Sequence, residues 1–279
     1  MAHIGRQLSG KQLKQSSIGG LKNNPIYRRV ADDKFPSLIL LAMSTPNSLV
    51  LSAADGTQLH AYVAQPQASG PAPGIILLQE AFGVNGHIRN VADRLAAAGY
   101  VVVAPELFHR TAAPGLEIPY SEFATQAMPH YGALTPEGLN HDLQAAYDWL
   151  QTQEDVQKDK IGSIGFCLGG QVAFRANAVL PLAAAVSYYG GGTHTIADLA
   201  KDLHAPHLFF WGGLDQHISK ENIKQVIDAV DAAGKPYINT VISYADHGFN
   251  CDERPSYNPD AAAEAWALTL AFFKNKLGA

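Results

Sequence analysis

From about residue 46 onward, short hydrophobic runs alternate with longer segments in which hydrophobic residues recur at helical spacing. The short runs predict strands at residues 75–78, 101–104, 161–165, 182–187, 207–211 and 237–243. The longer segments predict helices at residues 88–98, 135–153, 168 onward, 219–233 and 258–274. Strands that alternate with helices of this length favour an α/β fold, in which a mainly parallel sheet carries helices on both faces.

Two segments lie outside this alternation. Residues 48–63 form two β-rich stretches around Asp55-Gly56, a dipeptide that favours a hairpin with a two-residue turn. Residues 1–45 are polar and basic and show no sustained period, so we expect an N-terminal extension that is partly disordered. The predicted organisation is therefore an extension at 1–45 followed by one α/β domain at 46–279.

The stretch at residues 161–170, Ile-Gly-Ser-Ile-Gly-Phe-Cys-Leu-Gly-Gly, joins a predicted strand to a predicted helix through Cys167. Its G-x-C-x-G pattern is that of a nucleophile elbow, in which the apical residue has a strained backbone and its neighbours must lack Cβ atoms. The turn also sets the thiol over the first turn of the helix, whose positive end favours a thiolate. A lone cysteine is more often a small buried hydrophobe. The strand–turn–helix context nevertheless makes Cys167 the candidate nucleophile.

Two candidate partners of Cys167 follow predicted strands further along the chain. Asp215 comes after one strand and His247 after the next. Nucleophile, acid and then histidine is the chain order of the α/β-hydrolase triad. In such a triad the imidazole takes the proton of the nucleophile and the carboxylate fixes the tautomer of the ring. Asp246 is a neighbouring carboxylate that competes with Asp215 for this orienting role.

Backbone donors are expected to complete the site. One is the N–H of Leu168, directly after the candidate nucleophile, and the second is the N–H of Ala81, in the loop after the strand at 75–78. Together they would form an oxyanion hole. Glu80, in the same loop, is either a solvent-facing acid or a carboxylate that contacts Cys167 and holds it as a thiol until substrate displaces it.

Composition argues against several other classes of protein. The chain has 279 residues, of which 47% are hydrophobic, and its net charge of −5 argues against nucleic acid or an acidic membrane as a partner. Two cysteines do not make a disulfide framework and fit a reducing compartment, so we expect a cytoplasmic protein. His204 and His207 are close in sequence but lack an evident third ligand, and we predict no metal site.

Four segments together resemble the dienelactone hydrolase (carboxymethylenebutenolidase) family. They are Gln79-Glu-Ala-Phe-Gly-Val-Asn85, Ala104-Pro-Glu-Leu-Phe108, Gly165-Phe-Cys-Leu-Gly-Gly170 and His247-Gly-Phe249. The resemblance covers roughly residues 48–276 and implies an α/β-hydrolase fold with the triad and oxyanion hole named above. It also implies that Glu80 masks the thiol, that no cofactor is needed, and that a small lactone or ester is hydrolysed through an acyl-thiol intermediate.

The chain departs from this family where substrate is bound. Dienelactone-cleaving members carry an arginine four residues after the histidine, where this chain has Cys251, and a second arginine at a position near Thr125. Arg110 and Arg254 are candidates to replace them, or are ordinary surface charges. The substrate-binding candidates from the sequence are Phe82, Arg110, Tyr120 and Tyr188. The strand end at 188–192, Tyr-Tyr-Gly-Gly-Gly, is a candidate pocket wall, although core or loop packing fits its two tyrosines equally well. We expect the chemistry to transfer better than the substrate.

The leading hypothesis is therefore a cysteine-dependent hydrolase of a small ester or lactone. One alternative is a thiol-redox protein that uses Cys167 with Cys251, although the chain has no C-x-x-C pair. The other alternative is a catalytically silent binding protein on an α/β-hydrolase fold, which the complete set of triad residues argues against.

Overall fold

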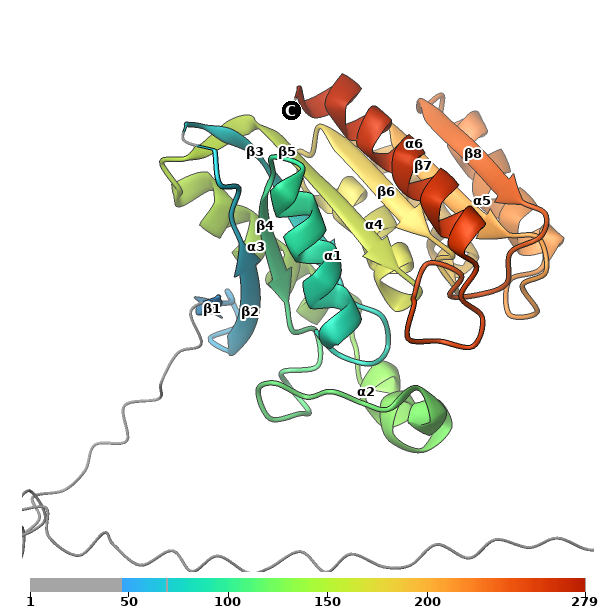
Figure 1. Ribbon diagram of the computed structural model, residues 1–279, viewed down its shortest axis with the longest axis horizontal. Helices are drawn as coiled ribbons and strands as arrows, with labels where there is room; N and C mark the ends of the chain where they lie inside the picture. The colour runs from blue at the N-terminus through green and yellow to red at the C-terminus, as the bar shows by residue number, and fades with distance from the viewer. Residues whose placement is uncertain (1–46, 69, 279) are drawn as a thin grey trace, which may run out of the picture. The chain divides into compact units, whose positions relative to one another are not determined.

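The structure, a computed structural model, describes residues 47–68 and 70–278. The predicted extension at residues 1–45 lies outside them. Within the described part, eight strands form one sheet in the order β1-β2-β4-β3-β5-β6-β7-β8 (Figure 1). The strands are β1 (Ser48–Ser52), β2 (Gln58–Ala64), β3 (Ala72–Leu78), β4 (Val101–Pro105), β5 (Val156–Phe166), β6 (Ala184–Tyr188), β7 (His207–Gly212) and β8 (Tyr237–Ile242). β2 pairs antiparallel with β1 and β4, and all other neighbouring strands are parallel.

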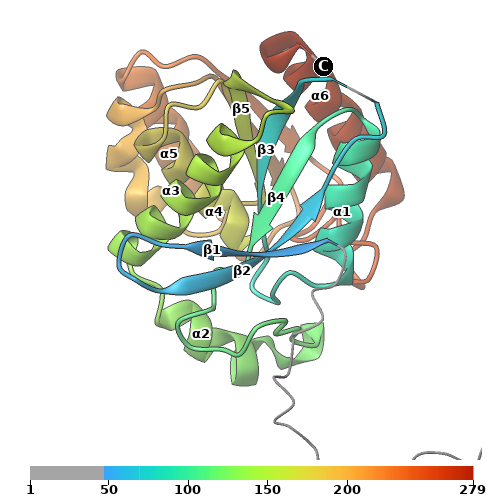
Figure 2. The same ribbon diagram turned by 90° about the vertical axis from the view of Figure 1, so that its left-hand side faces the viewer.

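Helices cover both faces of this sheet, as expected of the predicted α/β fold. The α-helices of the described part are α1 (Gly86–Ala97), α2 (Met128–Gly132), α3 (Pro136–Thr152), α4 (Leu168–Val179), α5 (Lys220–Ala232) and α6 (Pro259–Leu277), of which α2 lies beyond the strand ends. Figures 1 and 2 show α1 and α6 on one face and α3, α4 and α5 on the other. In the part of the chain that the structure describes, no helix is long and apolar enough to cross a membrane.

Capping residues set the starts of three helices where the sequence predicts them. Thr135 accepts a hydrogen bond from the first turn of α3, whose first residue is Pro136. Ser219 caps α5 and Asn258 caps α6 in the same way. A side-chain oxygen at this position satisfies an N–H group that has no acceptor within the helix, so these boundaries were predictable.

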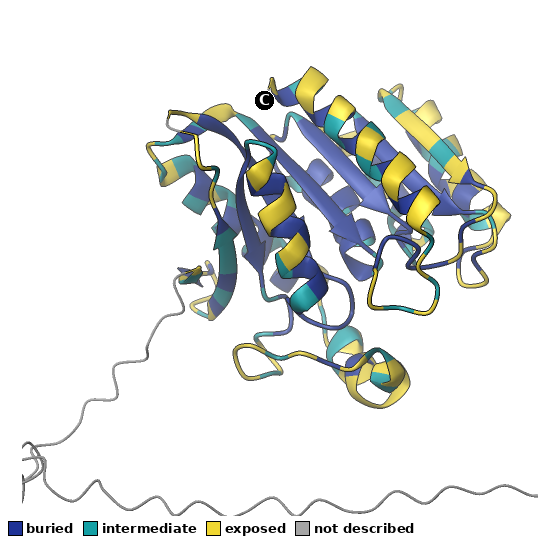
Figure 3. Ribbon diagram, viewed as in Figure 1, coloured by how far each residue is buried: buried dark blue, intermediate teal, exposed yellow. Residues whose placement is uncertain are grey.

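At β3, hydrophobic core lies on both faces of the sheet. Along β3, Ile75 and Leu77 belong to the layer that contains α1, whereas Ile76 and Leu78 belong to the layer that contains α3. All four side chains are fully buried, because successive residues of a strand point to opposite faces and helices cover both. Figure 3 shows the same division, with buried strands inside and the exposed sides of α1 and α6 outside.

The hairpin between β1 and β2 differs from the predicted two-residue turn. The N–H of Ala53 donates to the carbonyl oxygen of Thr57 at 2.9 Å, and the N–H of Gly56 donates to the carbonyl oxygen of Ala53 at 3.0 Å. Gly56 has a φ of 82°. A reverse turn followed by a left-handed glycine is the common three-residue hairpin loop. The Asp55-Gly56 dipeptide therefore marks the turn, but the predicted turn length was wrong.

Candidate active site

Cys167 lies at the sharp turn between β5 and α4, with a φ of 53° and a ψ of −114°. Its N–H donates to the carbonyl oxygen of Tyr188 at 3.0 Å, which ties the turn to the end of β6. A Cβ at Gly165 would lie 1.9 Å from the carbonyl oxygen of Gly169, and one at Gly169 would lie 2.1 Å from that of Leu78. Only glycine fits at these two positions, as the strand–turn–helix interpretation requires.

The three side chains predicted to form a triad meet beyond the carboxyl ends of β5, β7 and β8. Nε2 of His247 lies 3.2 Å from Sγ of Cys167, and Nδ1 lies 2.8 Å from Oδ2 of Asp215. The other oxygen of Asp215 accepts hydrogen bonds from the backbone N–H groups of residues 217 and 218. Asp246 accepts a hydrogen bond from the backbone N–H of His247, not from its ring. The structure therefore brings Asp215, rather than Asp246, to the imidazole.

The surroundings of His247 favour its charged form. Burial disfavours an imidazolium, but the Coulombic attraction of Cys167 and the hydrogen bonds with Asp215 and Cys167 outweigh it and raise the pKa of His247 to about 10. Burial also acts on Asp215, yet its hydrogen bond with His247, the charge of that ring and the backbone donors lower the pKa of its carboxyl. The ring can therefore hold a proton between a sulfur atom and a carboxylate.

Two backbone donors, at the start of α4 and in the loop after β3, have no acceptor among the described residues. The N–H groups of Leu168 and Ala81 make no hydrogen bond to any residue that the structure describes. Leu168 is the first residue of α4, where a helix has no internal acceptor. Gly169 packs against the carbonyl groups of residues 78 and 79, which brings the start of α4 against the loop that carries Ala81. This arrangement suits the predicted oxyanion hole.

Glu80 is fully buried, so its interpretation as a solvent-facing loop acid is wrong. Its Oε1 lies 3.4 Å from Nη1 of Arg254, and its Oε2 has no hydrogen-bond partner among residues 47–68 and 70–278. The guanidinium of Arg254 lies 5.7 Å from the ring centroid of Phe82 and 5.9 Å from that of Tyr120. The thiol of Cys167 bonds to the imidazole in this structure, and the masking role of Glu80 stays a prediction.

Tyr120 is a junction of polar contacts beside this ion pair. Its hydroxyl accepts hydrogen bonds from Nδ2 of Asn85 at 2.8 Å and from the thiol of Cys251 at 3.2 Å. It donates to Oε2 of Glu253 at 3.0 Å. Its ring packs edge-on against Phe82, with 4.7 Å between the centroids. The structure places Tyr120 and Phe82 beside Arg254, and their contact with substrate stays a prediction.

Arg110 is engaged elsewhere, which corrects its assignment as a substrate-binding residue. Its Nη1 and Nη2 bind the carboxylate of Asp142 at 2.8 and 2.9 Å, and its Nη2 and Nε bind Oδ2 of Asp55 at 2.7 and 3.1 Å. Because all three nitrogen atoms donate to protein carboxylates, the guanidinium is not free to bind a carboxylate of the substrate.

Tyr188 is a core residue, which corrects the second such assignment. Its side chain is fully buried, and its ring packs between Phe166 and Phe210 with centroid distances of 4.6 Å to each. Its hydroxyl shares a hydrogen bond of 2.7 Å with Thr269 of α6. The side chain is therefore satisfied inside the protein and takes no part in lining the site.

Two aromatic residues beside His247 are not among the substrate-binding candidates selected from the sequence. The ring centroid of Tyr189 lies 5.1 Å from that of His247, and the centroid of His217 lies 5.3 Å from it. Tyr189 is fully buried, whereas His217 is exposed. The glycine run that follows Tyr189 marked this strand end as a candidate pocket wall, but sequence reasoning selected the wrong tyrosine of the pair. Nothing in the sequence pointed to His217.

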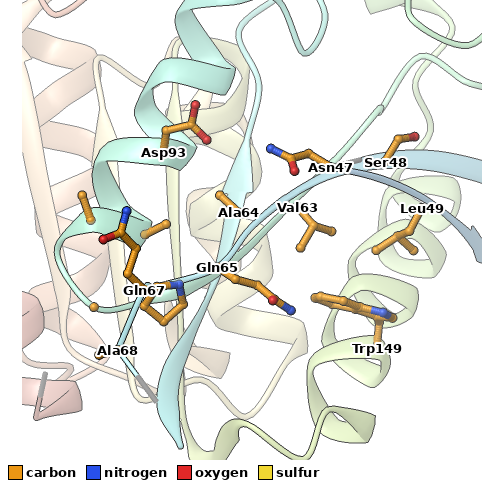
Figure 4. Close-up of a pocket in the computed structure, with 14 residues that line it drawn as sticks. Asn47, Ser48, Leu49, Val63, Ala64, Gln65, Gln67, Ala68, Asp93 and Trp149 are labelled. Atoms are coloured by element: carbon orange, nitrogen blue, oxygen red, sulfur yellow. The ribbon is translucent and has the colours of Figure 1, made fainter. Parts of the chain in front are cut away.

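Two surface cavities lie apart from Cys167 and His247. One, of about 730 Å³, lies between β2, α1 and α3 and is lined by residues that include Val63, Asp93 and Trp149 (Figure 4). The other, of about 620 Å³, lies between α5 and β8 and reaches Asp215. Because neither cavity is lined by the candidate nucleophile, the site is defined by side-chain contacts and not by these hollows.

His207, considered above as a metal ligand, is part of the core. Its Nε2 lies 2.8 Å from Oγ of Ser187, and its Nδ1 lies 3.2 Å from Nδ2 of Asn177. Burial lowers the pKa of His207 to about 3, so the ring is neutral at ordinary pH. In the described ranges, no group of three or more His, Cys, Asp or Glu residues could hold a metal ion.

Three features define the class of protein. The sheet is mainly parallel with helices on both faces, a strained residue follows β5, and an acid and a histidine follow β7 and β8. The protein is a hydrolase of the α/β-hydrolase fold.

Comparison with known proteins identifies the family. The model of the dienelactone hydrolase family matches residues 59–277, and the chain belongs to that family. It is 33% identical to a Synechocystis protein provisionally named carboxymethylenebutenolidase, over 85% of this chain and 100% of that protein. The crystal structure of a provisionally named dienelactone hydrolase from Klebsiella pneumoniae is 32% identical, with a TM-score of 0.72, and the match covers 81% of this chain and 97% of that one. A dienelactone hydrolase-like promiscuous phosphotriesterase from metagenomic libraries is 25% identical, with a TM-score of 0.71 and coverage of 82% and 98%.

Proposed function

We propose that this protein hydrolyses a small carboxylic ester or lactone through a thioester formed on Cys167. The observation that carries the proposal is the line of contacts from sulfur to imidazole to carboxylate, at 3.2 and 2.8 Å. Such a line lets one histidine move a proton between a nucleophile and a leaving group. The names of the relatives, carboxymethylenebutenolidase and dienelactone hydrolase, support the class of substrate.

In the first half of the reaction, the sulfur of Cys167 attacks the carbonyl carbon of the substrate. A carbon–sulfur bond forms, and one electron pair of the carbonyl group moves onto its oxygen. The proton that leaves the thiol resides on Nε2 of His247. As the tetrahedral intermediate collapses, the ester carbon–oxygen bond breaks and Nε2 gives this proton to the departing oxygen. In a lactone the released hydroxyl group stays attached to the acyl chain.

In the second half, a water molecule hydrolyses the thioester. Nε2 of His247 takes a proton from the water as its oxygen attacks the acyl carbon. The carbon–sulfur bond then breaks, the carboxylic acid leaves, and the sulfur recovers its proton from Nε2. Asp215 accepts the hydrogen bond of Nδ1 throughout, so it holds the ring in one tautomer and stabilises the imidazolium.

The negative oxygen of both tetrahedral intermediates needs hydrogen-bond donors. The N–H groups of Leu168 and Ala81 are free of protein acceptors among the described residues, and Gly169 packs the start of α4 against the loop that carries Ala81, so we assign them this role. Fixed donors of this kind stabilise the charge that develops in the transition state more than they stabilise the neutral carbonyl group of the substrate.

Charge near the site favours a neutral substrate. Arg110 is committed to Asp55 and Asp142, and Arg254 already faces the carboxylate of Glu80. A carboxylate on the substrate would have to compete with a buried glutamate for Arg254. We therefore expect neutral esters and lactones to react faster than their carboxylated counterparts.

A thiol-redox role explains fewer of these contacts. Cys167 and Cys251 are both free, and Cys251 is buried with its thiol directed to the hydroxyl of Tyr120. A redox pair would also leave the contacts of His247 and Asp215 without a purpose. A silent binding protein would have no use for a strained backbone at Cys167.

The test is hydrolysis of p-nitrophenyl acetate, a neutral enol-lactone and a carboxylated dienelactone by the wild type, Cys167→Ala and Cys251→Ser. We expect Cys167→Ala to lose at least about 10³-fold in kcat/KM, whereas Cys251→Ser stays within about threefold, because this small, buried change leaves the triad in place. Equal turnover by the wild type and Cys167→Ala would contradict the proposal. Loss of activity in Cys251→Ser alone would favour the redox role.

A further inference from the structure

Tyr189 has an unusual backbone for a residue with a side chain. In the part of the chain that the structure describes, Cys167 and Tyr189 are the non-glycine residues with positive φ, at 53° and 37°. Residues with a Cβ rarely adopt this conformation, because the Cβ approaches a neighbouring carbonyl oxygen. Such strain persists where surrounding contacts enforce it, and it concentrates at functional sites. One of the two residues is the proposed nucleophile, and the other touches the proposed base.

The backbone around Tyr189 is fixed on two sides. The carbonyl oxygen of Tyr188 accepts the N–H of Cys167 at 3.0 Å, and the N–H of Tyr189 donates to the carbonyl oxygen of Phe210 at 2.7 Å. The chain at the end of β6 is therefore bonded to the elbow and to β7. The strained turn at Tyr189 then places its ring 5.1 Å from that of His247 and 5.2 Å from that of Phe249, centroid to centroid.

His247 needs such a contact. It lies in the loop after β8, and the two hydrogen bonds of its ring, to Asp215 and Cys167, both lie along the ring edge. Hydrogen bonds at the two nitrogen atoms fix the direction in which the ring edge points, but they only weakly resist a tilt of the ring plane. A buried ring packed at 59° to the imidazole plane restricts that tilt. His217 also touches the imidazole but is exposed, so Tyr189 is the contact that the core holds in place.

The hydroxyl group of Tyr189 contributes nothing to this packing. It is buried and has no hydrogen-bond partner within residues 47–68 and 70–278. A buried hydroxyl without a partner destabilises the folded protein. Removal of this oxygen alone should therefore leave the ring contact intact and should not lower the melting temperature, which makes Tyr189→Phe the matched control for loss of the ring.

We infer that Tyr189 is a positioning residue whose strained backbone carries its ring from the elbow to His247 and holds the imidazole in line between Cys167 and Asp215. The inference rests on the proposed function, since it assigns Tyr189 a part in the proton transfers of that site. Tyr189 touches neither sulfur nor substrate in this role and acts through His247 alone.

The test compares Tyr189→Leu, Tyr189→Phe and a control, Phe174→Leu, which removes a fully buried ring that packs on His207 and Phe209 and not on His247. With p-nitrophenyl acetate, we expect Tyr189→Leu to lower kcat about 10- to 100-fold at nearly constant KM, with a shifted pH profile. Tyr189→Phe should restore kcat to within about threefold of the wild type. Phe174→Leu should lower the melting temperature about as much as Tyr189→Leu while kcat stays within about twofold.

Histidine ring NMR supplies a readout that does not depend on turnover. Tyr189→Leu should shift the Nδ1 and Nε2 resonances of His247, whereas Phe174→Leu should leave them unchanged. Unchanged resonances and unchanged kcat in a folded Tyr189→Leu would overturn the inference while the proposed function stands. A wild type that turns over no ester would instead refute the proposed function, and the resonances alone would then decide whether Tyr189 positions the ring.

Discussion

The charge on His247 depends on the sulfur beside it, and Cys167→Ala tests this dependence. The pKa of His247 lies at about 10, compared with an ordinary value of 6.5, a difference worth roughly 5 kcal/mol in favour of the imidazolium. The Coulombic attraction of Cys167 is the largest cause that raises this pKa, and burial opposes it. In Cys167→Ala, the hydrogen bond and the charge of Asp215 are all that remains to raise the pKa of His247, and burial still lowers it. We expect the pKa of His247 to fall well below 10 in Cys167→Ala.

The sign of the accompanying stability change follows from the direction of the shift. A pKa that is raised in the folded protein stabilises it fully below pH 6.5, and this contribution is lost as the pH rises through about 10. The wild type should therefore lose more stability between pH 7 and pH 10 than Cys167→Ala does. Urea unfolding at these two pH values measures the difference.

The direct assay is ¹⁵N NMR of labelled histidine across pH 5 to 11, with Cys251→Ala as the control that removes the other thiol. The control should keep the pKa of His247 near that of the wild type, because Cys251 is not among the causes of its shift. A wild-type His247 that titrates near 6.5 would refute the reasoning. So would a pKa that is the same with and without the sulfur of Cys167.

Three further predictions concern the scaffold. Gly169→Ala puts a Cβ 2.1 Å from a carbonyl oxygen of β3 and should cost about 3 kcal/mol or more in urea unfolding, whereas Gly132→Ala, with open space around it, should cost less than about 1 kcal/mol. Burial lowers the pKa of His207 to about 3, so below pH 6.5 the unfolded chain binds a proton that the folded protein does not. As the pH falls from 6.5 to 4.5, the wild type should therefore lose about 1.4 kcal/mol of stability per pH unit through this residue, and His207→Gln should not. Unfolding measured at these two pH values checks the difference. Arg110→Gln leaves the buried carboxylate of Asp142 without its arginine and should lower stability by about 2–3 kcal/mol. Its KM for a carboxylated ester should not change, and a raised KM would return Arg110 to the substrate site.

The sheet and its helices were predictable because their signals are local. Continuous hydrophobic runs mark strands that are covered on both faces, and the caps at Thr135, Ser219 and Asn258 mark helix starts. The length of the hairpin loop was not predictable. Several turns fit an Asp-Gly dipeptide, and the one adopted depends on how the two strands pair.

The candidate triad was predictable for a related reason. Parallel strands end at one edge of the sheet, so residues that follow β5, β7 and β8 must meet there, however far apart they lie in the sequence. The positions of the Arg110 and Tyr188 side chains depend instead on partners that are distant in the sequence. Arg110 binds an aspartate 55 positions away, and Tyr188 bonds to a threonine 81 positions away. No local pattern encodes such contacts.

The backbone of Tyr189 shows the same limit. The N–H of Tyr189 bonds to β7, and the carbonyl oxygen of Tyr188 bonds to the elbow. These contacts with other parts of the chain hold Tyr189 in its left-handed conformation. A glycine at this position would have predicted such a conformation. A tyrosine gives no such signal, so the contact of Tyr189 with His247 could not be predicted from the sequence.

The central claim is that Cys167 carries the acyl group, and intact-protein mass spectrometry tests it most directly. The wild type is mixed with p-nitrophenyl acetate, quenched in acid within milliseconds to seconds, and compared with Cys167→Ala treated in the same way. We predict that the wild type gains the mass of one acetyl group, that proteolysis locates it on Cys167, and that it decays at the rate of turnover. Turnover by the wild type with no acetyl group on Cys167 at any time, or equal acetylation and turnover in Cys167→Ala, would contradict the account.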